Sequence, residues 1–377
     1  MLTGFPRRGS SGSCPLFQRL APRARGVYIP AQHGEEPTQG LKTMKRILFL
    51  VLAFALATGT VFAQTPEIEQ KKEQLAEIRD KMANAGTPEE YDKLKEQYEA
   101  LGAEIKQLVD ALQADKQAKA QSIQFYNQAN EKIKARRWGE AVNLYKQAVE
   151  KDPLLAPAYY MMGVAHQQMK NYEEALKAFT QAINVRSDYD KAYNAKGVVL
   201  LKLSRLDEAI ETYRRAVQLP SADPGVKSDA LNGMGLTYNK MKKYDQAISA
   251  FQQAVMEDPD NHEAYFNMGR AYQVKKDHES AVEAYGNATK VKSDKEKYWV
   301  AYADALNLSG NYSEAEQAAR SAISVKSNSP GGHFQLGWAL EHLGRKQDAL
   351  PHYEKARNDR QYRQSAEYQI KLINGEI

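Results

Sequence analysis

The seven histidines are the side chains of this 377-residue chain best suited to binding a metal or transferring a proton. A zinc site needs several ligands at defined spacings, such as the two histidines of an HExxH helix, and the sequence contains no such motif. His262, His333 and His342 are isolated, and His342 and His352 are expected on different helices. His278 occupies a position that carries a bulky packing residue elsewhere. The histidines are therefore predicted to be structural, with no metal site.

Other patterns that could do chemistry are also weak. Gly233 and Gly235 have the spacing of part of a phosphate-binding loop, but both lie inside a predicted helix with no strand before it. The single cysteine, Cys14, lies in an N-terminal stretch without periodicity, so the rest of the chain has no thiol nucleophile, thiolate ligand or disulfide. The elements assigned below leave no segment for a catalytic domain. We therefore predict no enzyme and no cofactor.

The dominant feature of the sequence is a repeat of 34 residues with one four-residue insertion. Residues at offsets 0, +4 and +7 from one alanine in each copy share a face of a helix, as in Ala175, Phe179 and Ala182. These alanines are Ala141, Ala175, Ala209, Ala247, Ala281, Ala315 and Ala349. Seven copies in phase predict seven pairs of helices.

Two further positions recur in each copy. Twelve residues before each alanine stands a small residue: Ala129, Gly163, Gly197, Gly235, Gly269, Ala303 or Gly337. Glycine inside a helix costs about 1 kcal/mol relative to alanine, so its recurrence predicts that two helices approach closely there. A bulky residue, usually aromatic, precedes the second helix: Trp138, Tyr172, Leu206, Tyr244, His278 or Tyr312, whereas Lys346 departs from the pattern.

This period, with these small and aromatic positions and the late prolines Pro153 and Pro259, resembles the tetratricopeptide repeat. The resemblance implies an all-α fold, a right-handed α-solenoid of seven helix pairs. The expected repeats are 122–155, 156–189, 190–223, 228–261, 262–295, 296–329 and 330–363. Residues 364–377 carry Ile370, Leu372 and Ile373 on one side and are expected to form a C-terminal capping helix.

Three irregularities interrupt the repeats. The insertion falls in residues 219–225, which contain two prolines, and it is expected to loosen or redirect the stack between the third and fourth repeats. The sixth repeat has Ala319 and Glu316 where the others carry an aromatic and an aliphatic residue, so it is expected to be the weakest link. Pro351 lies inside the second helix of the seventh repeat and is expected to distort the first turns of that helix.

The resemblance also implies a binding groove, because the first helix of each pair lines the concave face of such arrays and its fifth and ninth positions point inward. The inward positions that we expect to bind a partner are Tyr126, Asn130, Tyr160, Asn194, Asn232, Phe266, Arg270, Asp304, Phe334 and Trp338. The remaining inward positions are Val164, Val198, Leu236 and Val300, and the valines suit packing between repeats equally well. Asparagine offers a donor and an acceptor, so it can hold a peptide backbone. The paired Lys and Asn residues with which chaperone-tail binders of this family hold a carboxylate are absent, since Tyr126 and Met161 stand at two of those positions.

Residues 44–63 have the pattern of a secretory signal peptide. A basic start, Met-Lys-Arg at 44–46, precedes an apolar run at 47–57, and the small residues Val61 and Ala63 follow. The run is much shorter than the roughly 20 residues that a membrane-spanning helix requires, so no span is expected in the mature chain. Cleavage is predicted between Ala63 and Gln64.

Residues 1–43 are rich in Pro, Gly, Ser and Arg and are expected to be disordered. We interpret them as a misassigned start, with translation beginning at Met44; the alternative is an unusually long targeting extension. The formal charge of +5 depends on the first 63 residues, which hold 8 of the 52 Lys and Arg and 2 of the 47 Asp and Glu. The remainder is nearly neutral, so no nucleic-acid partner is expected.

Residues 64–121 are predicted to form a helical coiled-coil segment. Apolar residues recur at alternating steps of three and four: Tyr91, Leu94, Tyr98, Leu101, Ile105, Leu108 and Leu112. A shorter run precedes them in another register: Ile68, Leu75, Ile78 and Met82. The turn at 84–86 separates the two. The short helix covers about half of the long seam, so self-association through 64–121 is favoured over a monomeric hairpin.

The sequence as a whole is interpreted as that of an exported, non-enzymatic scaffold that binds a protein or peptide partner in its groove. A periplasmic or secreted protein of a bacterial host is favoured, and the layout is similar to the periplasmic coiled-coil and repeat protein of the Tol-Pal system. One alternative is a binder of envelope polysaccharide, suggested by Tyr126, Tyr160, Phe266, Phe334 and Trp338, or a non-catalytic subunit of an envelope enzyme complex. Another is a structural oligomer whose groove stays empty.

Overall fold

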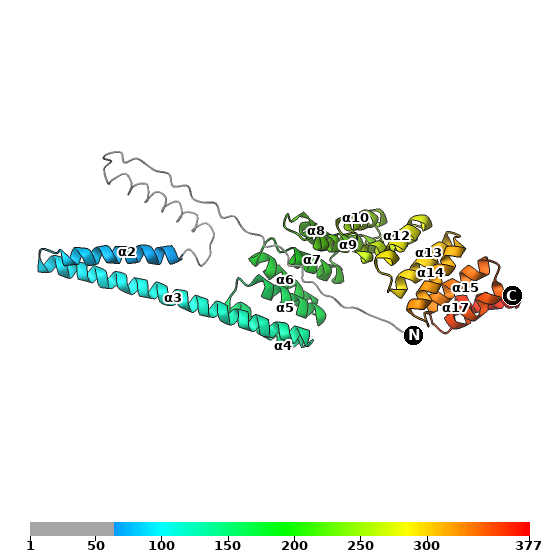
Figure 1. Ribbon diagram of the computed structural model, residues 1–377, viewed down its shortest axis with the longest axis horizontal. Helices are drawn as coiled ribbons and strands as arrows, with labels where there is room; N and C mark the ends of the chain where they lie inside the picture. Colours follow the sequence, from blue (N-terminus) through cyan, green and yellow to red (C-terminus); the bar gives the residue numbers. More distant parts are fainter. Residues whose placement is uncertain (1–63) are drawn as a thin grey trace, which may run out of the picture. The chain divides into compact units, whose positions relative to one another are not determined.

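The computed structural model describes residues 64–377, and within them every regular element is an α-helix (Figure 1). The predicted signal peptide at 44–63 and the preceding residues 1–43 lie outside this range. Contacts divide the chain into two units, and the boundary between Asp110 and Ala111 falls inside the long helix α3. The predicted fold class, an all-α solenoid of helix pairs preceded by a helical segment, is confirmed.

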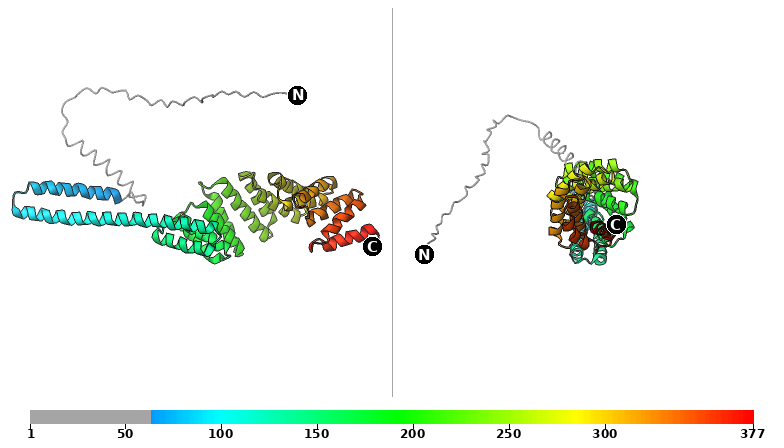
Figure 2. Two further views of the ribbon diagram at one scale, coloured as in Figure 1. Left: turned by 60° about the horizontal axis from the view of Figure 1, so that its bottom comes forward. Right: turned by 90° about the vertical axis from the view of Figure 1, so that its right-hand side faces the viewer.

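The first unit contains α2 (Gln64–Ala83) and the N-terminal half of α3 (Pro88–Lys134). The N-terminus of α3 is capped by Thr87, whose hydroxyl accepts a hydrogen bond from the Glu90 amide at 3.2 Å. After this turn the first half of α3 runs back along α2 (Figures 1 and 2), and an ion pair of 2.8 Å joins Lys71 of α2 to Glu104 of α3. The two helices therefore form a hairpin.

The apolar seam of this hairpin is only partly covered. Ile68 is the single buried residue between positions 66 and 110, at 4 % exposure. The α3 seam residues from Leu94 to Leu112 are half-buried, and Tyr91 is 44 % exposed. The coiled-coil pairing of this segment stays a prediction.

The second unit stacks helix pairs side by side (Figures 1 and 2). The C-terminal end of α3 provides the first helix of the first pair. The other first helices are α5 (Ala156–Gln168), α7 (Asp190–Lys202), α9 (Pro224–Lys240), α11 (His262–Val274), α13 (Glu296–Leu308) and α15 (Pro330–His342). The second helices are α4 (Trp138–Lys151), α6 (Tyr172–Val185), α8 (Leu206–Gln218), α10 (Tyr244–Glu257), α12 (His278–Val291), α14 (Tyr312–Val325) and α16 (Lys346–Ala356). First helices of successive pairs contact one another, as α5 does α7 and α7 does α9, so they form one layer of the array.

The recurring glycines mark the closest approach of the two helices in a pair. A Cβ atom on Gly163 would lie 2.6 Å from the Phe179 ring, and one on Gly235 would lie 2.5 Å from the Phe251 ring. The same contact joins Gly197 to Tyr213, Gly269 to Tyr285 and Gly337 to Tyr353. Each ring is at most 1 % exposed. The glycines are therefore needed to admit a large ring, which confirms the packing reason inferred from the sequence.

The insertion before the fourth repeat does not loosen the stack. Its residues extend α9 by a first turn that begins at Pro224, and the Asp223 carboxylate caps this turn by accepting from the Gly225 amide at 2.9 Å. Tyr213 of the third repeat packs against Gly233 of the fourth, where a Cβ atom would lie 2.5 Å from its ring. The expectation of a loosened linker was wrong because the extra residues continue the helix instead of interrupting it.

The sixth repeat compensates for its missing aromatic residue. Ala303 and Ala319 are fully buried in one cluster with Leu336 of the seventh repeat. Glu316 forms ion pairs with Arg320 at 2.7 Å and with Arg345 of the seventh repeat at 3.0 Å. An ionic bridge thus stands where the other repeats have an aliphatic contact.

The C-terminal end of the array is covered by α17 (Arg363–Asn374). Its Ala366 is fully buried, and Ile370 and Ile373 pack against the cluster formed by the sixth and seventh repeats. The preceding helix α16 runs through Pro351 without a break. Since α17 follows the last pair directly, it adds side chains to the end of the first-helix layer.

Candidate binding surface

The described residues contain no group of three or more His, Cys, Asp or Glu side chains placed to hold a metal ion. Within the same range, no helix combines the length and the apolar character needed to cross a bilayer. The features of the first-helix layer described next are the shape, charge and hydrogen bonding of its cavities.

One histidine pair escaped the sequence analysis. His333 of α15 and His352 of α16 place their Nδ1 atoms 3.0 Å apart, and His333 Nε2 lies 3.1 Å from the Ser327 carbonyl. If Nε2 of His333 donates to that carbonyl, its Nδ1 accepts a hydrogen bond from His352. Burial, with His333 and Lys355 nearby, lowers the pKa of His352 to about 4, so the pair is neutral near pH 7. The hydrogen bond between the two histidines joins α15 to α16, the two helices of the seventh repeat.

A first cavity, the N-terminal cavity, lies between α5, α7 and α9. It has a volume of about 390 Å³, and its lining includes Tyr160, Val164, Asn194, Val198 and Asp229. Four of these five are inward positions predicted from the repeat register. Asp229 comes from α9, and burial together with Glu263 and Asp258 raises its pKa. The cavity thus combines apolar walls with the amides of Asn194, Gln167 and Gln168, the Asp229 carboxylate and the Lys191 ammonium group.

Asn194 is the distinctive group of the N-terminal cavity. Its Oδ1 atom is buried and has no hydrogen-bond partner within residues 64–377. An unpaired buried acceptor costs free energy, typically about 1 to 3 kcal/mol. A donor on a bound molecule, such as a backbone N–H group, would remove this penalty after the amide rotates toward the cavity.

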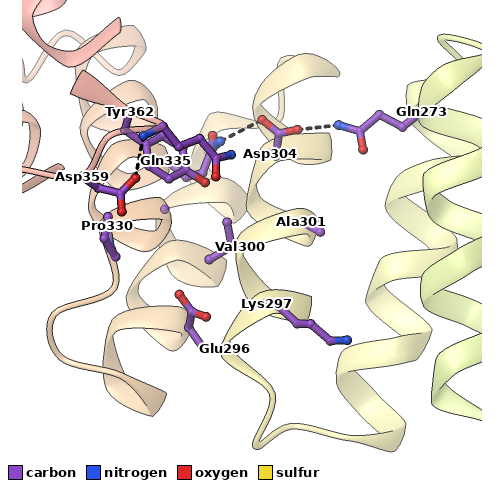
Figure 3. A pocket seen from close by; sticks show the side chains of 12 residues that line it. Gln273, Glu296, Lys297, Val300, Ala301, Asp304, Pro330, Gln335, Asp359 and Tyr362 are labelled. Carbon is purple, nitrogen blue, oxygen red and sulfur yellow. Dashed lines mark hydrogen bonds between the residues drawn. The ribbon is translucent and has the colours of Figure 1, made fainter. Parts of the chain in front are cut away.

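A second cavity, the acidic cavity, lies between α13, α15 and the turn that leads into α17 (Figure 3). Its volume is about 420 Å³. The carboxylates of Glu296, Asp304 and Asp359 surround it, and among the lining side chains from residues 64–377 Lys297 is the only basic one (Figure 3). The Tyr362 ring forms part of the wall.

Asp304 is held by amides from both neighbouring repeats. Gln273 of α11 donates to one carboxylate oxygen at 2.5 Å, and Gln335 of α15 donates to the other at 2.8 Å (Figure 3). The chain of hydrogen bonds continues outward, because Tyr285 donates to Gln273 at 2.9 Å and Asn307 donates to Gln335 at 2.8 Å. Burial raises the pKa of Asp304, and the two amides offset only part of this effect. The network orders the floor of the acidic cavity.

A third cavity, the aromatic cavity, lies between α15 and α17 and measures about 480 Å³. Every side chain that lines it is uncharged: Phe334, Trp338, Gln364, Ser365, Tyr368 and Gln369. The Phe334 and Trp338 rings meet edge to face with centroids 6.2 Å apart, and Trp338 is half-buried. Oε1 of Gln369 is buried without a hydrogen-bond partner in the described part of the chain.

The other predicted groove residues are engaged in packing or lie apart from the cavities. Asn130 accepts a hydrogen bond from Tyr145 at 2.6 Å, and Asn232 is 7 % exposed and accepts from Asn267 at 3.0 Å. Tyr126 packs on the Tyr145 ring, and Phe266 packs on Tyr285 and Tyr298. Arg270 is exposed to solvent. The structure thus brings Tyr160 and Asn194 together at one cavity and Phe334 and Trp338 at another.

Sequence reasoning missed the cavity residues that come from outside the repeat register. Glu296 begins α13, Asp359 lies in the turn after α16, and Tyr362 and Tyr368 belong to the C-terminal segment. The register assigns inward positions only within first helices, so it contains no signal for side chains that a turn or a capping helix brings to the same face.

Comparison with known proteins agrees with this architecture. Family models described as "Tetratricopeptide repeat" match residues 160–225, 228–261, 262–295 and 309–366, together about half of the chain. A search of curated proteins gives no significant match.

Among solved structures, similar chains include YrrB, described as "a TPR protein with an unusual peptide-binding site", which is 28 % identical with a TM-score of 0.38 over 46 % of this chain and 87 % of YrrB. MamA from Desulfovibrio magneticus RS-1 is 23 % identical with a TM-score of 0.41 over 46 % of this chain and 97 % of MamA. PilF of Pseudomonas aeruginosa is 16 % identical with a TM-score of 0.49 over 57 % of this chain and 96 % of PilF.

Proposed function

Because the chain belongs to the tetratricopeptide repeat family, whose members bind protein or peptide partners, we propose that it is an exported, non-enzymatic scaffold that holds a segment of a partner protein against its layer of first helices. The observation that carries the proposal is the N-terminal cavity, where the buried Asn194 acceptor has no donor among residues 64–377. A peptide can supply that donor from its backbone, whatever its side chains.

Two substitutions separate binding from packing. Asn194→Leu removes the unpaired amide, so it should leave the thermal midpoint unchanged or raise it, while it weakens peptide binding about tenfold, the equivalent of one lost hydrogen bond of about 1.4 kcal/mol. Asn232→Leu is the matched control, because Asn232 already pairs with Asn267. It should lower the midpoint and leave the affinity of the folded protein nearly unchanged.

The binding probe is a random dodecapeptide library selected on the immobilised full chain, with affinities of the selected peptides measured by calorimetry. A glycan array run in parallel tests the polysaccharide alternative. Failure to select any peptide, or equal affinities for wild type and Asn194→Leu across every selected peptide, would contradict the proposed function. Binding of glycans alone would favour the alternative.

Export is supported by the basic start, apolar run and small residues of positions 44–63. We predict that the mature protein begins at Gln64 and that N-terminal sequencing of exported material will show this. A mature chain that begins before Met44 would contradict both the signal peptide and the internal start. Self-association through residues 64–121 and a link between envelope machines, as in the Tol-Pal layout, belong to the same proposal.

A further inference from the structure

The C-terminal end of the first-helix layer contains two cavities of opposite chemistry that share a wall. The acidic cavity is lined by Tyr362 and the aromatic cavity by Phe334, and these two rings lie with centroids 5.3 Å apart. We propose that the two cavities together recognise a partner segment that carries a basic residue beside an aromatic residue. This inference rests on the proposed function and adds the chemistry of the partner.

The charge of the acidic cavity favours a cation. In the C-terminal repeats, ion pairs form at Glu316 and Asp348, but Glu296, Asp304 and Asp359 pair with no Lys or Arg of the described chain. The one ammonium group in the lining, Lys297, lies 5.0 Å from the Phe266 ring and 5.1 Å from the Tyr298 ring. Three carboxylates therefore face the cavity against one cation that is occupied by ring contacts.

The wall of this cavity suits a guanidinium group better than an ammonium group. Tyr362 offers a ring face beside the carboxylates, and a guanidinium stacks on aromatic rings and binds carboxylates with two parallel hydrogen bonds. The three carboxylates reach this ring electrostatically: after burial, Asp304, Asp359 and Glu296 are the groups that raise the pKa of the Tyr362 hydroxyl. Gly331 allows the Tyr362 side chain to take this position, because a Cβ atom at residue 331 would lie 2.7 Å from the Tyr362 hydroxyl and 2.8 Å from Val300.

The aromatic cavity has the complementary character. It contains no charged side chain, its volume of about 480 Å³ accommodates a ring, and Phe334, Trp338 and Tyr368 supply aromatic contacts. The Gln369 acceptor has no donor within the described part of the chain, and a partner's backbone N–H group or indole N–H group would satisfy it after a small rotation of the amide. Aromatic anchors in such cavities dominate binding energies at protein interfaces.

The distance between the cavities sets the spacing of the two partner residues. An extended chain advances about 3.3 Å per residue, and alternate side chains point to the same face about 7 Å apart. The wall between the two cavities is the Phe334 and Tyr362 ring pair, whose centroids are 5.3 Å apart. A basic and an aromatic residue of the partner can therefore enter the two cavities if at most one residue lies between them.

The test uses synthetic peptides chosen from the library selection described above. Peptides bound at this end should contain Arg or Lys within two positions of an aromatic residue. Each is made in three forms: the parent, one with citrulline in place of the basic residue, and one with alanine in place of the aromatic residue. Fluorescence anisotropy with the full chain then gives the dissociation constants.

The chain variants should act on one partner residue each. Asp359→Asn and Glu296→Gln should each weaken the parent peptide about tenfold and leave the citrulline peptide unaffected, because the lost interaction is with the cation. Trp338→Ala should weaken the parent peptide about thirtyfold, but not the alanine peptide, with a nearly unchanged thermal midpoint. Glu279→Gln, which removes an exposed carboxylate of α12 outside both cavities, is the control and should change nothing.

Three results would overturn the inference. Selected peptides without the basic and aromatic pair would do so, as would an equal loss of affinity for the parent and citrulline peptides in Asp359→Asn and Glu296→Gln. Peptides sensitive to Asn194→Leu but insensitive to all three C-terminal variants would refute the two-cavity site and leave the proposed function intact. Selection of no peptide at all would defeat both.

Discussion

The α2–α3 hairpin and the repeat array are both entirely helical, yet they bury their side chains to very different degrees. Each repeat except the sixth buries a large ring at 0 or 1 % exposure between its two helices, as Phe179 and Phe251 show. In the hairpin the α3 seam residues are half-buried, and Tyr91 is 44 % exposed. Helices in the array pack against neighbours within and between pairs.

This difference shows that helical periodicity predicts which face of a helix is apolar, but not how completely that face is covered. In the array every pair has another pair or the capping helix α17 beside it, so burial is completed within one chain. In the hairpin the seam from Leu94 to Leu112 keeps an open side. We expect a second copy of the chain to cover it.

The largest expected effect is on oligomeric mass, which tests whether a second chain covers the hairpin seam. Light scattering should give residues 64–377 at least twice the mass of one chain and residues 122–377 the mass of a single chain, because only the longer segment contains the open seam. Monomers in both samples would show that the hairpin is complete in itself and that half-burial suffices for its stability.

The next largest effect is expected in the core of one repeat. Phe179→Ala removes a fully buried ring and should lower the free energy of unfolding of the array by about 3 to 5 kcal/mol. Tyr98→Ala in the seam removes a half-buried ring and should cost well under half as much. All three tryptophans, Trp138, Trp299 and Trp338, lie in the array, so their fluorescence reports its unfolding in urea, and hydrogen exchange of α3 amides reports the hairpin.

Equal losses in the two regions would contradict the burial difference on which the comparison depends. Phe179→Leu serves as the control, because it keeps most of the apolar volume and should recover a large part of the lost stability.

The fold was predictable from the sequence because the same small and aromatic residues recur at the same spacing in each regular repeat. The glycine at Gly163 and the ring at Phe179 lie 16 residues apart in every regular copy, and the structure joins them. The insertion was misjudged because proline permits two outcomes. It ends a helix in the interior but suits the first turn, and Pro224 begins α9.

The binding surface was only partly predictable. Repeat register identified Asn194 and Trp338 as inward positions, and both line cavities. It also selected Asn130 and Asn232, whose side-chain oxygens accept hydrogen bonds from Tyr145 and Asn267. Which asparagine keeps an acceptor without a partner among residues 64–377 depends on the side chain that faces it from the second helix, as Tyr145 does, or from the next repeat, as Asn267 does, and a single sequence does not state that pairing. The acidic cavity was missed because Asp359 reaches it from a turn.

The smallest expected effect concerns two ion pairs, of which the one in the hairpin has the more exposed carboxylate, as the hairpin also has the more exposed apolar side chains. Lys71 and Glu104 pair across the hairpin, where the glutamate side chain is 58 % exposed. Glu316 is 18 % exposed and holds two arginines, one of them in the next repeat. Exposed pairs contribute little because water and salt screen them, whereas a partly buried carboxylate with two guanidinium partners keeps more of its interaction.

Glu316→Gln should therefore lower the free energy of unfolding of the array by on the order of 1 kcal/mol at pH 7, while Glu104→Gln should have no measurable effect on the hairpin. Burial alone would raise the pKa of Glu316, but the hydrogen bonds from Arg320 and Arg345 outweigh it, and the pKa lies below its ordinary value. A carboxyl group with a lowered pKa stabilises the fold above its unfolded pKa near 4.5, and this contribution is lost as the pH falls through the folded pKa. The difference between wild type and Glu316→Gln in urea titrations should thus be constant from pH 7 to pH 5 and shrink below pH 4.5. A difference that persists at pH 3, or an equal loss for Glu104→Gln, would show that the sixth repeat depends on the shape of this side chain rather than on its charge.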